Sequence, residues 1–154
     1  MLPALNLPQA PLKLTRSGEN ITVFDEWRKK NLLLTSEEWV RQHVLWYLVT
    51  DLGFPSSLLA VEYAITVNNL KRRCDIVAFG KDGKAKLIVE CKAPHIKLDE
   101  VTFLQIAQYN FNLNVDYLII SNGLDHIIAK INRENQQIEY LKQFPSFGEI
   151  TKQD

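Results

Sequence analysis

The sequence predicts a single α/β domain. Its 154 residues are 46% hydrophobic and 23% charged, a balance typical of a globular chain with a sizeable core rather than of a disordered or fibrous one. Short runs rich in β-branched and aromatic residues alternate with two stretches whose apolar residues recur at helical spacing. These observations predict one mixed domain over residues 21–154, preceded by an extended N-terminal arm of residues 1–20.

The arm contains Pro3, Pro8 and Pro11 and shows no sustained periodicity, so we expect extended backbone there. Two short strands are predicted next, over 21–28 and 30–34.

The first helix is predicted to begin after Thr35, which has the hydroxyl of an N-cap, with Glu38 three residues later as its capping-box partner. Apolar residues recur at helical spacing from Val40 onward, and Gly53-Phe54-Pro55 ends the helix near residues 51–52.

Later in the chain the alternation of apolar and polar residues predicts strands, and one segment has the spacing of a second helix capped by Asp99. The predicted strands are 59–67, 73–79, 84–92, 117–121, 126–131 and 137–141, and the predicted helix is 99–112.

The strands 73–79 and 84–92 are predicted to form a hairpin across Gly80-Lys81-Asp82-Gly83. A two-residue turn at Asp82-Gly83 places Asp75 directly opposite Glu90, and a four-residue loop also keeps the two on one face. Lys92 shares that face because side chains alternate along a strand. The opposite face then holds only small or apolar residues, namely Cys74, Ile76, Ala78, Leu87, Val89 and Cys91.

Two neighbouring carboxylates in strands this hydrophobic are costly unless a cation neutralises them. Oxygen ligands from Asp75 and Glu90, with the backbone carbonyl of Cys91, suit Mg²⁺ or Mn²⁺ better than zinc. Lys92 is then positioned to orient or deprotonate an attacking water. The spacing therefore predicts a centre for hydrolysing phosphodiesters.

At these residues the sequence resembles the PD-(D/E)XK nucleases, with Asp75 followed after fourteen residues by Glu90-Cys91-Lys92. The segments 32–42, 73–77 and 90–94 resemble the N-terminal nuclease domain of type I restriction enzyme R subunits, and the similarity extends over about residues 25–121. The chain departs from that pattern in having Cys74 where the motif has Pro, and no helicase motor follows.

The resemblance implies a restriction-endonuclease-like core of three layers, α/β/α, around a central mixed sheet. It also implies Mg²⁺-dependent hydrolysis of DNA, with a helicase or restriction-system subunit as a further partner; two cuts on a duplex would suit a homodimer. The family's Gln-x-x-x-Tyr motif matches Gln105 and Tyr109, which by resemblance contact DNA or support the site. By the same resemblance Glu37 is a candidate to complete the metal site; helix-dipole stabilisation is the alternative for this first-turn acid.

Net charge is zero, but the segment 71–97 holds eight basic and three acidic residues, a net charge of +5. Within it, Lys71, Arg72 and Arg73 either steer a phosphate backbone or form a solvated strand entry. The chain lacks an apolar run long enough to span a bilayer and a secretion signal, and its two cysteines form no disulfide framework, so we expect a cytoplasmic protein with reduced thiols and no membrane partner.

Two other classes of function remain open from the sequence. One is a catalytically inactive module of the nuclease fold that binds nucleic acid or a motor subunit. The other is a purely structural α/β protein in which Asp75 and Glu90 are solvated surface residues.

Overall fold

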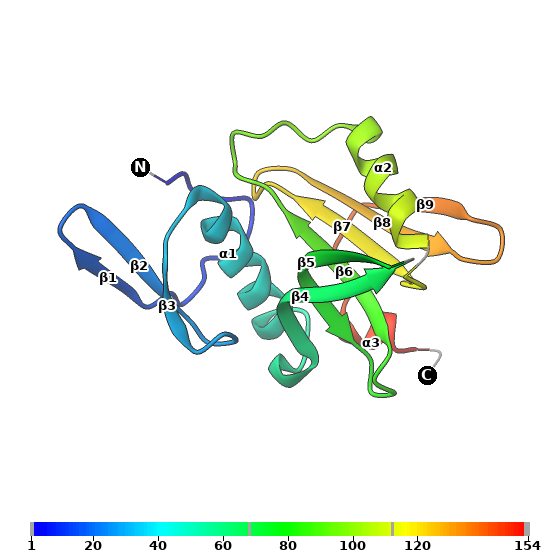
Figure 1. The fold of residues 1–154 in the computed structure, drawn as a ribbon, viewed down its shortest axis with the longest axis horizontal. Helices are drawn as coiled ribbons and strands as arrows, with labels where there is room; N and C mark the ends of the chain where they lie inside the picture. Colours follow the sequence, from blue (N-terminus) through cyan, green and yellow to red (C-terminus); the bar gives the residue numbers. More distant parts are fainter. Residues whose placement is uncertain (1, 68, 112, 153–154) are drawn as a thin grey trace.

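The computed structural model describes residues 2–67, 69–111 and 113–152 (Figure 1). Over these residues the chain forms strands and helices in the following order: β1 (Leu14–Ser17), β2 (Asn20–Asp25), β3 (Lys30–Leu33), α1 (Ser36–Thr50), a 3₁₀ turn (Ser56–Leu58), β4 (Leu59–Val67), β5 (Leu70–Phe79), β6 (Ala85–Cys91), α2 (Glu100–Phe111), β7 (Tyr117–Ser121), β8 (His126–Asn132), β9 (Gln137–Leu141) and α3 (Phe147–Ile150).

The main sheet is mixed, as the sequence predicts. Its strands lie in the order β4-β5-β6-β7-β8-β9, and β6 and β7 run parallel whereas the other neighbouring pairs are antiparallel. A parallel pair needs a crossover connection, and α2 lies in the connection between β6 and β7. Strands β1, β2 and β3 form a separate antiparallel sheet.

Helices α1 and α2 cover opposite faces of the main sheet (Figure 1). Strand residues alternate between the two cores: Val89 packs with Val44 of α1, whereas Ile88 packs with Phe103 of α2. The β5–β6 hairpin thus lies at the centre of the fold, buried from both sides. No helix within the described residues is long and apolar enough to cross a membrane.

The β5–β6 hairpin keeps the predicted register next to the candidate site but not at its turn. Ile76 pairs with Val89 and Ala78 with Leu87, as predicted. A bulge after Ala78 then pairs Phe79 with Ala85, so the two-residue turn is wrong and the loop is longer. Gly80 closes this loop by donating its amide to the Lys84 carbonyl at 2.9 Å.

One residue of the predicted apolar face lies elsewhere. Five of the six pack against α1, but Cys74 packs in the α2 core. The regular pairing of β5 with β6 ends at Ile76. The predicted alternation of side chains between the two faces of the sheet therefore does not extend to Cys74. Both cysteines are free and buried, and burial raises the pKa of each thiol, which keeps them unreactive.

The N-terminal segment contains a strand that the sequence analysis did not predict, β1, which pairs with β2. Ahead of it the chain lies against the main body. The Asn6 amide donates to the Gly123 carbonyl at 2.8 Å, and Trp39 Nε1 of α1 donates to the Pro3 carbonyl at 2.9 Å. Leu5 packs so closely on Gly123 (φ +86°) that a Cβ there would lie 2.7 Å from a Leu5 methyl.

Helix α1 begins as predicted, with the Thr35 hydroxyl accepting from the Glu38 amide at 3.0 Å. The capping-box role of the Glu38 side chain is wrong, because its carboxylate is only 6% exposed and binds Arg28 and Arg41 instead. Two arginines that converge on one carboxylate outcompete a backbone amide as partners.

Asp25 anchors this buried charge network. Its fully buried carboxylate accepts from the Trp27 amide at 2.7 Å, the Arg28 amide at 2.8 Å, Arg28 Nε at 2.7 Å and Gln42 Nε2 at 3.0 Å. We expect Asp25→Ala to lower the free energy of unfolding by about 3–5 kcal/mol, because it removes a buried charged acceptor from the half-buried Arg28 and the buried Gln42. Urea unfolding measures the loss, with the exposed Asp51→Ala as control; equal losses in the two variants would contradict a structural role for the network.

Candidate active site

Asp75 lies where β5 and β6 part. The regular pairing of the two strands ends at Ile76 and Val89, and the Asp75 side chain takes over the next backbone contact. Its Oδ2 accepts the Cys91 amide at 2.7 Å, and its Oδ1 accepts Nη2 of Arg41 at 2.9 Å. The carboxylate is therefore fixed from two sides at the edge of the α1 core.

Glu90 adjoins Asp75 and is only 8% exposed. Burial, the charge of Asp75 and a hydrogen bond with the Asp75 carboxyl raise the pKa of Glu90 to about 8. Nη2 of Arg72 lies 3.0 Å from Glu90 Oε1 and opposes this shift without cancelling it. Burial is the largest cause of the shift, so the ionised form of Glu90 is unfavourable in the folded chain even with Arg72 beside it.

The raised pKa of Glu90 has a measurable consequence for stability. A carboxyl whose pKa is raised on folding costs nothing below its ordinary value of 4.5, and its cost is complete above about 8. We therefore expect Glu90→Gln, which keeps an acceptor for Arg72, to raise the melting temperature of the metal-free protein by about 2–6 °C at pH 8 and much less at pH 5.

Thermal unfolding at the two pH values tests this expectation. Glu139→Gln, on the exposed strand β9, is the matched control and should have no pH-dependent effect. A Glu90→Gln variant that is less stable than wild type at pH 8 would contradict the assignment of Glu90 as a carboxyl strained by burial.

Lys92 follows β6 directly and lines a pocket of about 460 Å³. Its amide donates to the Ser121 carbonyl at 2.8 Å, which ties it to the end of β7. Glu37 of α1 lines the same pocket, as do residues of the connection to α2, of α2 itself and of β7 and β8, namely Ala93, His95, Ile96, Lys97, Leu98, Asp99, Thr102, Ile120 and Ile127. A hollow large enough for a small ligand therefore opens beside Lys92 and Glu37, and neither Asp75 nor Glu90 lines it.

The remaining predicted residues differ in their placement. Glu37 lies near Asp75, because both approach Nη2 of Arg41, at 3.2 and 2.9 Å. Gln105 lies on an exposed face of α2 and does not line the pocket beside Lys92. Tyr109 falls within α2, but its side chain lies outside the described part of the chain.

Sequence reasoning missed three charged residues of this site: Arg41, Arg72 as the partner of Glu90, and Glu62, whose Oε1 lies 3.0 Å from Arg41 Nη2. One signal in the sequence pointed to Arg41. It stands beside Val40, three and four residues after Glu38 and Glu37, so a helix presents it to both acids next to its apolar stripe.

The residues present fit a magnesium or manganese ion. Asp75 and Glu90 offer neighbouring carboxyl oxygens, and a bound cation would favour the ionised form of the buried Glu90. Among the described residues no three His, Cys, Asp or Glu side chains are spaced to hold a metal. Mg²⁺ does not need three, because it is commonly bound by one or two carboxylates and keeps water or phosphate oxygens as its other ligands.

The fold and the site together define a mixed α/β domain in which two neighbouring acids lie where strands of the central sheet part, with a lysine directly after one of these strands. The family model for the N terminus of the type I restriction enzyme R protein matches residues 36–145. The chain belongs to this family, and the match includes each of Asp75, Glu90 and Lys92. A search of curated proteins finds no match.

A solved structure has a similar fold. It is a fragment described as an HsdR subunit of a type I restriction enzyme from Vibrio vulnificus, with a TM-score of 0.56 and 19% sequence identity. The similarity covers 76% of this chain and 24% of that one, so the chain spans about a quarter of the length of its structural neighbour.

Proposed function

We propose that this domain is a Mg²⁺- or Mn²⁺-dependent deoxyribonuclease of the PD-(D/E)XK type, which hydrolyses DNA phosphodiester bonds in restriction or DNA processing. The observation that carries the proposal is the placement of Glu90 beside Asp75, buried and with its pKa raised, with Lys92 two residues further along. Membership of the restriction R-subunit family supports DNA as the substrate.

Each residue of the site has a part in this reaction. Asp75 and Glu90, with the backbone carbonyl of Cys91, would hold the ion, and the contact of the Cys91 amide with Asp75 Oδ2 keeps that carboxylate in place. When bound, the ion supplies positive charge that acidifies water and stabilises the phosphate in the transition state. Lys92 orients the attacking water or takes its proton, and Glu37 lines the same pocket.

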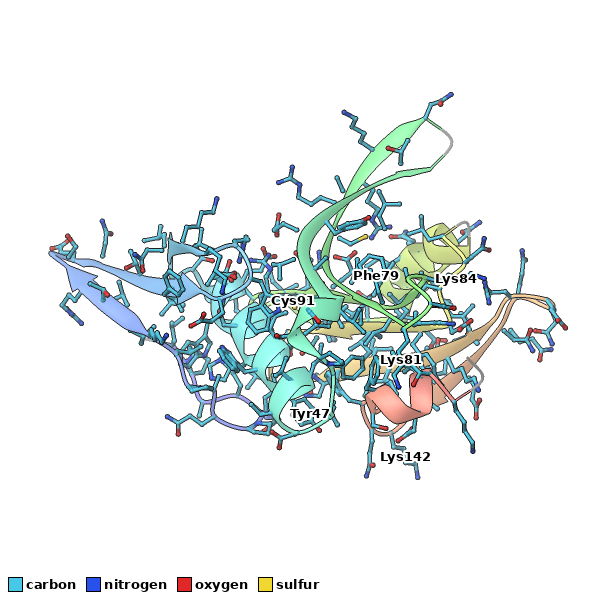
Figure 2. All side chains as sticks on the ribbon, turned by 90° about the horizontal axis from the view of Figure 1, so that it is seen from below. Tyr47, Phe79, Lys81, Lys84, Cys91 and Lys142 are labelled. Carbon is cyan, nitrogen blue, oxygen red and sulfur yellow. The ribbon has the colours of Figure 1, made fainter. Side chains whose placement is uncertain are left out.

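The charge of the surrounding surface favours a polyanion. The β4–β5 hairpin extends away from the rest of the sheet (Figure 2). It carries Lys71, which is exposed, and Arg73, whose side chain is 68% exposed. Lys81 and Lys84, labelled in Figure 2, lie in the β5–β6 turn at the other end of β5 and are not part of this surface. Exposed cations of this kind contact phosphates and make binding depend on salt.

One observation favours a second candidate function, an inactive module that binds nucleic acid or a restriction subunit. Both carboxylates already have an arginine partner, Arg41 for Asp75 and Arg72 for Glu90. We rank this second because Asp75, Glu90 and Lys92 of the nuclease motif are all present within the segment that matches the R-subunit family.

The test uses the wild-type chain, supercoiled plasmid and Mn²⁺ or Mg²⁺. We expect nicking that stops with a chelator, and a melting temperature that rises with Mn²⁺. DNA binding that weakens with salt, without nicking in either metal, would favour the inactive module. If Mn²⁺ does not change the melting temperature, DNA does not bind and no nicking occurs, the structural reading of this domain would stand. The same nicking assay, repeated with a helicase, a restriction subunit or a higher concentration of this chain, shows whether any of these partners raises the activity.

A further inference from the structure

The pocket beside Lys92 has an apolar floor that the proposed hydrolysis does not use. Ile120 and Ile127 pair across β7 and β8, and both line the pocket. Ile96 and Leu98, from the connection between β6 and α2, add to its wall, and Ile96 is 41% exposed. A metal ion, a water or a phosphate gains nothing from aliphatic side chains, so this part of the pocket fits an apolar group of a ligand.

The wall of this pocket is held in place by hydrogen bonds. Asn122 is only 3% exposed, and its Nδ2 donates to the Ile96 carbonyl at 2.8 Å. The Ile96 amide donates to the Ala93 carbonyl at 3.0 Å, and the Lys92 amide donates to the Ser121 carbonyl at 2.8 Å. The connection that leads to α2 (Figure 1) is thus tied to the end of β7 at two points. A ligand meets a formed pocket, which lowers the entropy cost of binding.

The charge that the pocket offers to a ligand is positive. Two acids and two lysines are among its lining residues. Both acids already have partners, since Glu37 Oε2 lies 3.2 Å from Arg41 Nη2 and the Asp99 carboxylate accepts a backbone amide of the first turn of α2 at 2.7 Å. Within the described part of the chain, the side chains of Lys92 and Lys97 have neither an ion pair nor a hydrogen bond. A ligand with an anionic group therefore fits these two lysines.

The pocket lies next to the proposed active site. Glu37, on its wall, and Asp75 contact the same nitrogen of Arg41, so one guanidinium separates this wall from Asp75. Lys92 lines the pocket and follows Glu90 by two residues. An apolar group joined to an anion, beside a centre for phosphodiester hydrolysis, is the chemistry of a nucleotide. Its base can bury its flat faces between apolar side chains while its phosphate contacts lysines.

We propose that this pocket binds the base of one unpaired nucleotide in the DNA strand, next to the phosphate that is cleaved. The position of that phosphate rests on the proposed nuclease function. A base within a duplex is paired and stacked, so it enters such a pocket only after it has left the stack. The substrate class that follows is DNA with a single-stranded or unpaired segment at the site of cleavage.

Fluorescence anisotropy with two labelled oligomers tests this proposal, in a chelator that prevents metal-dependent cleavage. One is a short oligothymidylate, and the other is an abasic deoxyribose phosphate chain of the same length and charge. Wild type should bind the oligothymidylate about tenfold more tightly. Ile96→Asp places a carboxylate in the exposed wall of the pocket and should lose this preference. Val101→Asp is the matched control and should keep it, because Val101 is 68% exposed on α2 and does not line the pocket.

Equal affinity of wild type for the two oligomers would overturn the inference, and so would a folded Ile96→Asp variant that keeps the preference. If Ile96→Asp does not fold, Ile96→Ala takes its place and should weaken the preference. Displacement of the oligothymidylate by an equal concentration of thymidine monophosphate would indicate a pocket for free nucleotides and overturn the assignment to a strand. Plasmid nicking in Mn²⁺ tests the nuclease separately: nicking without a base preference removes only this inference, and a base preference without nicking removes the nuclease and leaves a pocket for a base.

Discussion

Asp75→Asn is expected to abolish Mn²⁺ binding and to lower metal-dependent nicking by about 10³-fold or more, since the hydrolytic centre depends on the ion that Asp75 would hold. The amide retains an oxygen that can accept the Cys91 amide, so the strand geometry that the 2.7 Å contact maintains should persist. What the substitution removes is the negative charge shared between Arg41 and the ion.

Calorimetry with Mn²⁺ and the plasmid assay measure these two effects, and circular dichroism verifies the fold. Asp82→Asn is the matched control, because Asp82 is an exposed acid in the turn of the same hairpin. Full nicking by Asp75→Asn would exclude Asp75 from the reaction. Loss of nicking with unchanged Mn²⁺ binding would place the ion elsewhere.

Lys92→Met is expected to separate metal binding from chemistry. Lys92 lines the same pocket as Glu37, and no hydrogen bond or ion pair with a described residue holds its side chain in a structural role. Its removal should leave one Mn²⁺ bound at wild-type affinity or somewhat tighter, since one positive charge is gone. Nicking should fall by about 10²–10⁴-fold, the range expected for loss of a group that moves a proton.

Single-turnover nicking at saturating Mn²⁺ measures the chemical step, with Lys84→Met at the other end of β6 as control. Lys84 is exposed and lies in the β5–β6 loop, away from the pocket. A Lys92→Met variant that nicks as fast as wild type at saturating metal and DNA would restrict Lys92 to substrate binding.

The structure confirms most elements that the sequence predicts, because their signals are local. The Thr35 cap and the apolar repeat that starts at Val40 define α1 from within one segment. The two-residue period of the strands predicts the pairing of Ile76 with Val89, next to Asp75 and Glu90, and the structure has this pair although the turn differs. The turn itself was predicted wrongly, because the bulge after Ala78 depends on how the strands twist against their neighbours.

The sequence by itself determined the α/β character of the chain, the hairpin and the acids and lysine it presents, since each depends on spacing along one or two adjacent strands. Only the tertiary structure decided how their charges are balanced. Arg41 meets Asp75 across 34 residues, and Arg72 meets Glu90 across 18. Contacts between distant segments leave no period in the sequence, and the burial that makes each charge costly exists only once helices and sheet have packed.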